Sequence, residues 1–132
     1  MKLKIFFDGS SHGNPGPSGI GVVVYNQDFV EVARFSEYVG VRTNNEAEYL
    51  ALKKALEIAL QLDAEEVELY SDSELLVKQI SGEYNVKNKN LLNLHREVQE
   101  LMEKVKVKIM HIDREENKLA DKLANEAAEN PR

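Results

Sequence analysis

The chain has 132 residues, a net charge of −6, 42% hydrophobic residues and no cysteine. The length predicts one domain, residues 1–132, and the lack of cysteine excludes disulfides and thiolate metal sites. The negative charge argues against a protein that coats nucleic acid non-specifically. Carboxylates around a divalent ion remain compatible with a nuclease. No apolar run is long enough to cross a membrane, and the N-terminal segment is too short and too soon polar for a signal peptide, so we expect a cytoplasmic protein.

The first half of the chain predicts a three-stranded meander followed by a helix. Alternating apolar and polar residues indicate the first strand, and β-branched, apolar segments indicate the next two. A segment rich in Gly, Pro and Ser predicts the loop between the first and second strands. The predicted elements are a strand at 2–8 that ends at Asp8, a loop at 9–19, strands at 20–26 and 29–40 around a turn near Gln27 and Asp28, and a helix at 43–62.

The second half alternates strands with helices, which predicts parallel strands joined by right-handed crossovers. The predicted elements are a strand at 65–72 that stops at Asp72, helices at 73–82 and 90–105, a strand at 105–113 and a helix at 114–129. The expected fold is therefore α/β, with a five-stranded mixed sheet of three antiparallel and two parallel strands, flanked by helices. In such sheets, ligands gather beyond the carboxyl ends of the parallel strands.

Glu48 is the least easily explained acidic residue, because a period of 3.6 places it on the apolar stripe of its helix, in line with Leu52. A carboxylate that faces the interior is costly unless a cation meets it. Glu46 falls on the polar side, three residues after Thr43, which is the spacing of a capping box. The two glutamates are thus predicted to have different roles.

Three aspartates have both an ordinary and a functional interpretation. Asp8 before Gly9 fits a turn, Asp72 fits a helix N-cap, and Asp121 fits the solvated edge of an apolar helix stripe. If they converge with Glu48, they would repel one another unless cations lay among them. Oxygen ligands favour a hard ion, so we expect two ions of Mg²⁺ or Mn²⁺, a known catalyst of phosphodiester cleavage.

The chain resembles type 1 ribonuclease H over nearly its whole length. The resemblance is carried by four ordered segments: FFDGSSHGNPGPSGIG, TNNEAE, YSDSELLVKQI and REENKLADKLANEA. Any one of them is a weak signal, but four in this order and spacing are a strong one. The resemblance implies a ribonuclease H-like fold, and it implies four catalytic carboxylates that bind the metal ions: Asp8, Glu48, Asp72 and Asp121.

The resemblance also implies contacts with substrate. The residues concerned are Gly13, Asn14, Thr43, Asn44 and Asn45, of which Thr43 belongs to a phosphate pocket at a helix start that offers N–H groups. His111 matches a catalytic histidine that assists product release near the scissile phosphate; the alternative is a histidine at a strand end with a satisfied hydrogen bond. His12 and His95 are expected at the surface.

One departure from the resemblance concerns residues 82–92, where many bacterial relatives carry a basic helical protrusion that grips the substrate. This chain moves almost directly from one predicted helix to the next. The remaining candidates for phosphate contact are Lys78, Lys87, Lys89 and Arg96. We therefore expect weaker substrate binding with a marked dependence on salt.

The activity implied by the resemblance is endonucleolytic hydrolysis of the RNA strand of RNA–DNA hybrids by two metal ions, giving 5′-phosphate and 3′-hydroxyl ends. We expect a monomer with no obligate protein partner and no membrane association. Two alternatives remain open: a hybrid-binding module that does not cleave, and another nuclease of the same superfold.

Overall fold

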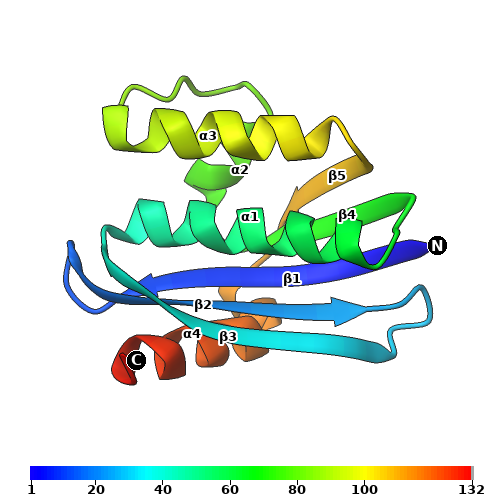
Figure 1. Cartoon of the computed structure of the whole chain (residues 1–132), viewed down its shortest axis with the longest axis horizontal. Helices are drawn as coiled ribbons and strands as arrows, with labels where there is room; N and C mark the ends of the chain where they lie inside the picture. Colours follow the sequence, from blue (N-terminus) through cyan, green and yellow to red (C-terminus); the bar gives the residue numbers. More distant parts are fainter. Residues whose placement is uncertain (132) are drawn as a thin grey trace.

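A five-stranded sheet lies between two helical layers in the computed structural model, which describes residues 1–131 (Figure 1). The strands are β1 (Lys2–Ser11), β2 (Gly16–Tyr25), β3 (Glu31–Arg42), β4 (Glu66–Ser71) and β5 (Lys106–His111). The helices are α1 (Asn44–Gln61), α2 (Glu74–Ile80), α3 (Lys89–Met102) and α4 (Lys118–Glu129), and a short 3-10 helix, η1 (Arg114–Asn117), leads into α4.

The strand order is β3-β2-β1-β4-β5, with antiparallel pairing among β1, β2 and β3 and parallel pairing of β4 with both β1 and β5. This order confirms the predicted mixed sheet. Helix α1 lies on one face with α3 packed over it, while α4 covers the opposite face (Figure 1). Of the helices within residues 1–131, none combines the length and the apolar character that crossing a membrane requires.

Strand β1 is longer than predicted, because it continues past Asp8 to Ser11 as one arm of a hairpin. Ser11 still pairs with Ser18 of β2. The pairing of β1 with β4 ends earlier, at Phe6 opposite Tyr70. Beyond Phe6, β1 therefore keeps its neighbour on one side only, and the carboxyl end of the sheet opens next to Asp8.

The alternation of side chains along β1 supplies both faces of the core. Leu3, Ile5 and Phe7 are fully buried in the cluster under α1. On the other face, Phe6 packs in a smaller cluster with α4. Gly21 of β2 makes this second contact close, since a Cβ at Gly21 would lie 2.3 Å from the carbonyl oxygen of Ala120. Helix α4 thus lies directly against the sheet.

The predicted capping box at the start of α1 is confirmed. The Thr43 hydroxyl accepts a hydrogen bond from the Glu46 N–H (3.1 Å), and Glu46 Oε1 accepts one from the Thr43 N–H (2.9 Å). These reciprocal bonds satisfy two backbone donors and fix where the helix begins. Glu48 then faces inward and is only 5% exposed, as its position on the apolar stripe predicts.

Candidate active site

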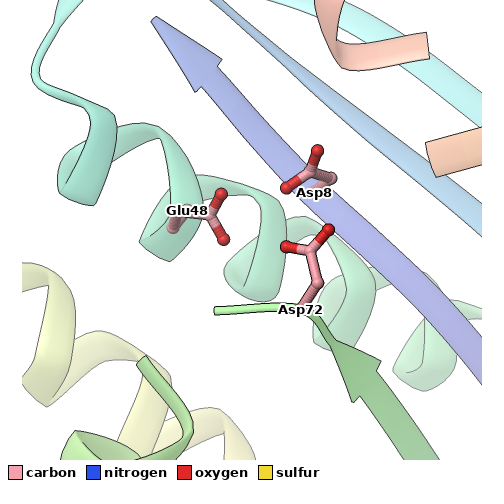
Figure 2. A group of neighbouring side chains, drawn as sticks. All are labelled: Asp8, Glu48 and Asp72. Atoms are coloured by element: carbon pink, nitrogen blue, oxygen red, sulfur yellow. The ribbon is translucent and has the colours of Figure 1, made fainter. Parts of the chain in front are cut away.

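Three carboxylates from separate elements meet at the carboxyl end of the sheet. Asp8 lies on β1, Glu48 on α1 and Asp72 directly after β4, and their side chains point toward one another (Figure 2). One carboxylate oxygen from each lies within 4.8 Å of the other two. Asp8 and Glu48 are 4% and 5% exposed. All three members of this group are carboxylates.

Gly9 brings Glu48 to Asp8. A Cβ at Gly9 would lie 2.3 Å from the backbone carbon of Ala47, so only glycine lets the first turns of α1 lie this close to β1. The Gly9 N–H donates to Glu48 Oε1 at 3.3 Å. Among residues 1–131, no hydrogen-bond donor reaches the buried Glu48 Oε2. An unpaired buried carboxylate oxygen is costly, and a hard divalent cation is the ligand that this set of oxygens fits.

Burial and crowding favour the protonated forms of these acids. Burial raises the pKa of Asp8 far above its ordinary value, and the nearby Glu48 and Asp72 charges raise it further. Burial also raises the pKa of Glu48. The pKa of Asp72 is raised by burial, while an Asn117 hydrogen bond and the Arg114 charge oppose the increase. In the absence of a cation, the cluster therefore retains protons that a bound cation would displace.

Asp121 lines the same hollow. It lies in the first turn of α4, is half-buried, and is close enough to Asp8 to raise the pKa of that carboxyl. It is outside the tight group of three, so the structure brings all four predicted carboxylates together but places Asp121 further out. The hollow measures about 340 Å³ and is lined by Asp8, Gly9, Ser10, Asn44, Glu48, Asp72, Ser73, Arg114, Asp121 and Asn125.

The ordinary interpretations of the three aspartates, as a turn residue, a helix N-cap and a solvated helix residue, do not fit the structure. Asp8 lies within a strand rather than in a turn. The N-cap of α2 is Ser73, whose side chain accepts a hydrogen bond from the Leu76 N–H at 3.2 Å, so Asp72 is not needed for capping. Asp121 is half-buried in the hollow rather than solvated at its edge.

Two asparagines that sequence reasoning did not single out support the acids. Asn117 is 2% exposed and donates from Nδ2 to the carbonyl oxygen of Phe7 at 2.9 Å, next to Asp8, and it lies close enough to Asp72 to oppose the increase in the pKa of that carboxyl. Asn125 hydrogen-bonds Asp121. A signal was present in the sequence, because Asn117 falls on the apolar stripe of α4 and Asn125 stands four residues after Asp121.

The proposed substrate contacts lie beside the hollow. The Asn44 N–H donates to Asn14 Oδ1 at 3.0 Å, which joins the first loop to the start of α1. Asn14 thus occupies an N–H group that the sequence analysis expected to remain available for a phosphate. The Thr43 hydroxyl accepts the capping hydrogen bond and retains its own proton as a donor. Gly13 and Asn45 are exposed at this surface.

The three histidines differ in their surroundings. His111 is exposed at the end of β5, opposite Ser71, and close enough to Asp72 for its charge to lower the Asp72 pKa. His12 is exposed, as expected. His95 is half-buried rather than at the surface, and its ring packs edge-on against Tyr49 with the ring centroids 6.2 Å apart.

Comparisons with known proteins agree with this geometry. Residues 6–127 match the family model described as "Reverse transcriptase-like". RNase H1 from the halophilic archaeon Halobacterium salinarum has a crystal structure that matches with a TM-score of 0.95 and 38% identity, covering 98% of each chain. The crystal structure of LC11-RNase H1 in complex with an RNA/DNA hybrid matches with a TM-score of 0.90 and 40% identity, covering 96% of each chain.

Some relatives are longer. A bifunctional protein of Mycobacterium tuberculosis is 41% identical over 129 residues, which are 96% of this chain and 35% of that protein. The chain thus spans about a third of the length of the first curated relatives that it matches.

Proposed function

Because the chain belongs to the type 1 ribonuclease H family, we propose that it is an endonuclease that hydrolyses the RNA strand of RNA–DNA hybrids. The observation that carries this proposal is the convergence of Asp8, Glu48 and Asp72, with a buried Glu48 oxygen that no protein donor within residues 1–131 reaches. A site made only of carboxylate oxygens suits Mg²⁺ or Mn²⁺. LC11-RNase H1, which shares this fold, was crystallised with an RNA/DNA hybrid, and this supports the same substrate class here.

The four carboxylates would hold two divalent ions, with Asp8, Glu48 and Asp72 in one tight group and Asp121 outside it in the same hollow. Such ions, when bound, activate the attacking water and stabilise the leaving 3′ oxygen. Asp8 would give up its proton on becoming a ligand. The products expected from this chemistry are 5′-phosphate and 3′-hydroxyl ends.

The first loop and the start of α1 form the proposed substrate surface. Gly13, Asn14, Asn44 and Asn45 would contact the sugar edges and backbone of the hybrid, and 2′-hydroxyl contacts in a shallow minor groove would select RNA at the cut strand. The Thr43 hydroxyl would donate to a phosphate of the DNA strand. These roles are supported by Asn44, which lines the acidic hollow and is joined to Asn14 by a hydrogen bond.

We assign His111 to product release near the scissile phosphate. Its exposure at the end of β5 and its proximity to Asp72 support this role, since an exposed side chain can reach a departing phosphate. We further propose that the described chain acts as one domain without an obligate protein partner.

Cleavage by the Asp72→Asn variant tests the function. Purified protein with Mg²⁺ should nick a labelled hybrid, and Asp72→Asn should reduce cleavage to background while circular dichroism shows an intact fold, because Ser73 caps α2. The matched control is Asp28→Asn, which removes an exposed carboxylate in the β2–β3 turn and should leave the rate unchanged.

Parallel assays with double-stranded RNA and single-stranded DNA, under Mg²⁺ and Mn²⁺, distinguish the alternatives. Binding of the hybrid without cleavage by the wild-type protein would identify a non-cleaving module. Preferential cleavage of either other substrate would identify a different nuclease. Full activity of Asp72→Asn would reject the assigned site.

A further inference from the structure

Asn125 is joined to three segments by four hydrogen bonds. Its Nδ2 donates to the Asp121 carbonyl oxygen (3.0 Å) and to Asp121 Oδ1 (3.2 Å). Its Oδ1 accepts from the Ser10 hydroxyl (2.7 Å) and from His12 Nε2 (3.0 Å). Because a side-chain amide has two N–H donors and two acceptor lone pairs, Asn125 uses its complete hydrogen-bonding capacity here.

Asp121 determines which way the Asn125 amide points. Both Asp121 partners are oxygens that accept hydrogen bonds, so the NH₂ group must face them and the carbonyl must face Ser10 and His12. A flipped amide would place its oxygen against a carboxylate. The same orientation requires Nε2 of His12 to carry a proton.

These bonds join the end of β1, the first loop and the first turns of α4. Ser10 follows Asp8 by two residues and points to the same face of β1, while His12 precedes the loop residues Gly13 and Asn14. Asp121 and Asn125 are one helical turn apart on the same face of α4. The network therefore fixes one oxygen of the Asp121 carboxylate relative to the strand that carries Asp8.

We propose that Asn125 is a positioning residue that holds the Asp121 carboxylate in the geometry needed to bind a divalent ion; this inference rests on the proposed function. Asp121 lies further out than the other three acids and is only half-buried, so packing alone restrains its rotation less. Partners that orient metal ligands typically change metal affinity or activity by about 10-fold to 100-fold when they are removed.

The test compares Asn125→Ala with Asn130→Ala. Asn130 is a matched control, because its Nδ2 also donates to the carbonyl oxygen four residues earlier on the same helix (Glu126, 2.9 Å), but it lies away from the hollow. Calorimetric titration of the metal-free protein with Mn²⁺, without substrate, should show about 10-fold weaker binding for Asn125→Ala. Asn130→Ala should bind like the wild type.

Hybrid cleavage gives the second measurement. Asn125→Ala should raise the Mg²⁺ concentration for half-maximal rate and lower kcat by about 10-fold, with KM for the hybrid unchanged. A purely structural role would not shift the metal requirement. An increase in KM alone would indicate that Asn125 contacts substrate, and equal Mn²⁺ affinity in Asn125→Ala and the wild type would overturn the proposal.

Ser10→Ala keeps the test valid if Asn125→Ala fails to fold. The substitution removes the strand-side donor to the Asn125 carbonyl, so it should weaken Mn²⁺ binding in the same direction but less. In Asn125→Ala, the additional removal of the Ser10 hydroxyl should have no further effect, since Ser10 acts through Asn125. Wild-type Mn²⁺ affinity in Ser10→Ala, or strictly additive effects in the double variant, would contradict the proposal.

The two proposals fail in different ways. If the wild-type protein binds Mn²⁺ but does not cleave the hybrid, the proposed function is wrong, while the binding titration still decides the role of Asn125. If the wild type cleaves and Asn125→Ala matches it in kcat, metal requirement and Mn²⁺ affinity, only the positioning role is wrong.

Discussion

Asp8 shares the acidic hollow with Glu48 and Asp121, and its carboxyl group keeps its proton at neutral pH when no cation is present. Burial is the largest cause of its raised pKa, followed by the charge of Glu48. In the unfolded chain the same group titrates near its ordinary value of 3.8. The folded state therefore binds more protons than the unfolded state above about pH 4, and the contribution of Asp8 to stability is progressively lost as the pH rises.

Asp8→Asn should consequently stabilise the metal-free protein at alkaline pH. Asparagine cannot ionise in either the folded or the unfolded state, so the stability of the variant does not decrease with rising pH through this position. In EDTA at pH 8, the free energy of unfolding should exceed the wild-type value by at least about 1.4 kcal/mol, the equivalent of one pKa unit, and the difference should shrink toward pH 4. Urea unfolding at both pH values measures it. A difference that is the same at pH 4 and pH 8 would show that Asp8 titrates normally.

The sequence predicts the acidic residues better than their supports. Glu48 stands out because an apolar helix stripe has a fixed period, and Asp8 and Asp72 stand out because parallel strands end at one edge of a sheet. Asn117 and Asn125 act across contacts between α4 and β1, which are distant in the sequence. The sequence carries only weak local signals for these residues, the position of Asn117 on the helix stripe and the four-residue spacing of Asn125 from Asp121, and neither signal shows which segment of the chain they contact.

At the scale of elements, the order and type of strands and helices are predictable from periodicity, whereas some boundaries are not. The predicted loop at 9–19 shrinks to residues 12–15 because β1 and β2 continue to pair beyond Asp8. Glycine and serine are poor strand formers, so tertiary pairing overrides the local signal. The predicted helix at 114–129 begins as a 3-10 turn, η1, and becomes α-helical only at Lys118.

The close approach of α1 to β1 at Gly9 leads to a prediction about both stability and activity. In Gly9→Ala, the new Cβ would meet backbone atoms of Ala47 and Glu48 at 2.3 to 2.5 Å, and backbone cannot move aside as a flexible side chain can. We expect a loss of about 1–3 kcal/mol in unfolding free energy. Displacement of α1 should also move Glu48 and sharply reduce hybrid cleavage.

Gly82→Ala is the comparison variant for this prediction. Gly82 has a φ of +87° but no atom within 4 Å of an added Cβ, so it tests backbone strain without a clash. This substitution should lower the free energy of unfolding by about 1–2 kcal/mol and leave hybrid cleavage unchanged. Urea unfolding and a hybrid cleavage assay measure both effects. Wild-type cleavage by Gly9→Ala would show that Glu48 does not depend on this contact.

For the whole molecule, a net charge of −6 must be reconciled with the polyanionic substrate that we propose. Residues 81–88, between α2 and α3, contain no helix, so the described chain carries no helical protrusion there. Two of the four candidate cations already have partners. Lys78 pairs with Glu74 at 2.8 Å and Arg96 donates to Asn93 at 2.9 Å.

Lys87 and Lys89 are the cations that remain available on this surface, since both are exposed and neither takes part in an ion pair within residues 1–131. The double substitution Lys87→Ala/Lys89→Ala should raise KM for the hybrid without changing kcat, because it removes positive charges that would face phosphates and leaves the carboxylates intact. The slope of log KM against log salt concentration should fall by about 1 for each phosphate that the variant no longer neutralises.

Steady-state cleavage at several salt concentrations measures this slope. Lys104→Ala is the matched control, as an exposed lysine just beyond the opposite end of α3. It should leave both KM and its salt dependence unchanged. If the double variant behaves like Lys104→Ala, the hybrid does not cross the α2–α3 connection. Its phosphates must then be held by the first loop and the start of α1. There, Thr43 and the asparagines provide hydrogen bonds rather than positive charge. Binding would then depend only weakly on salt.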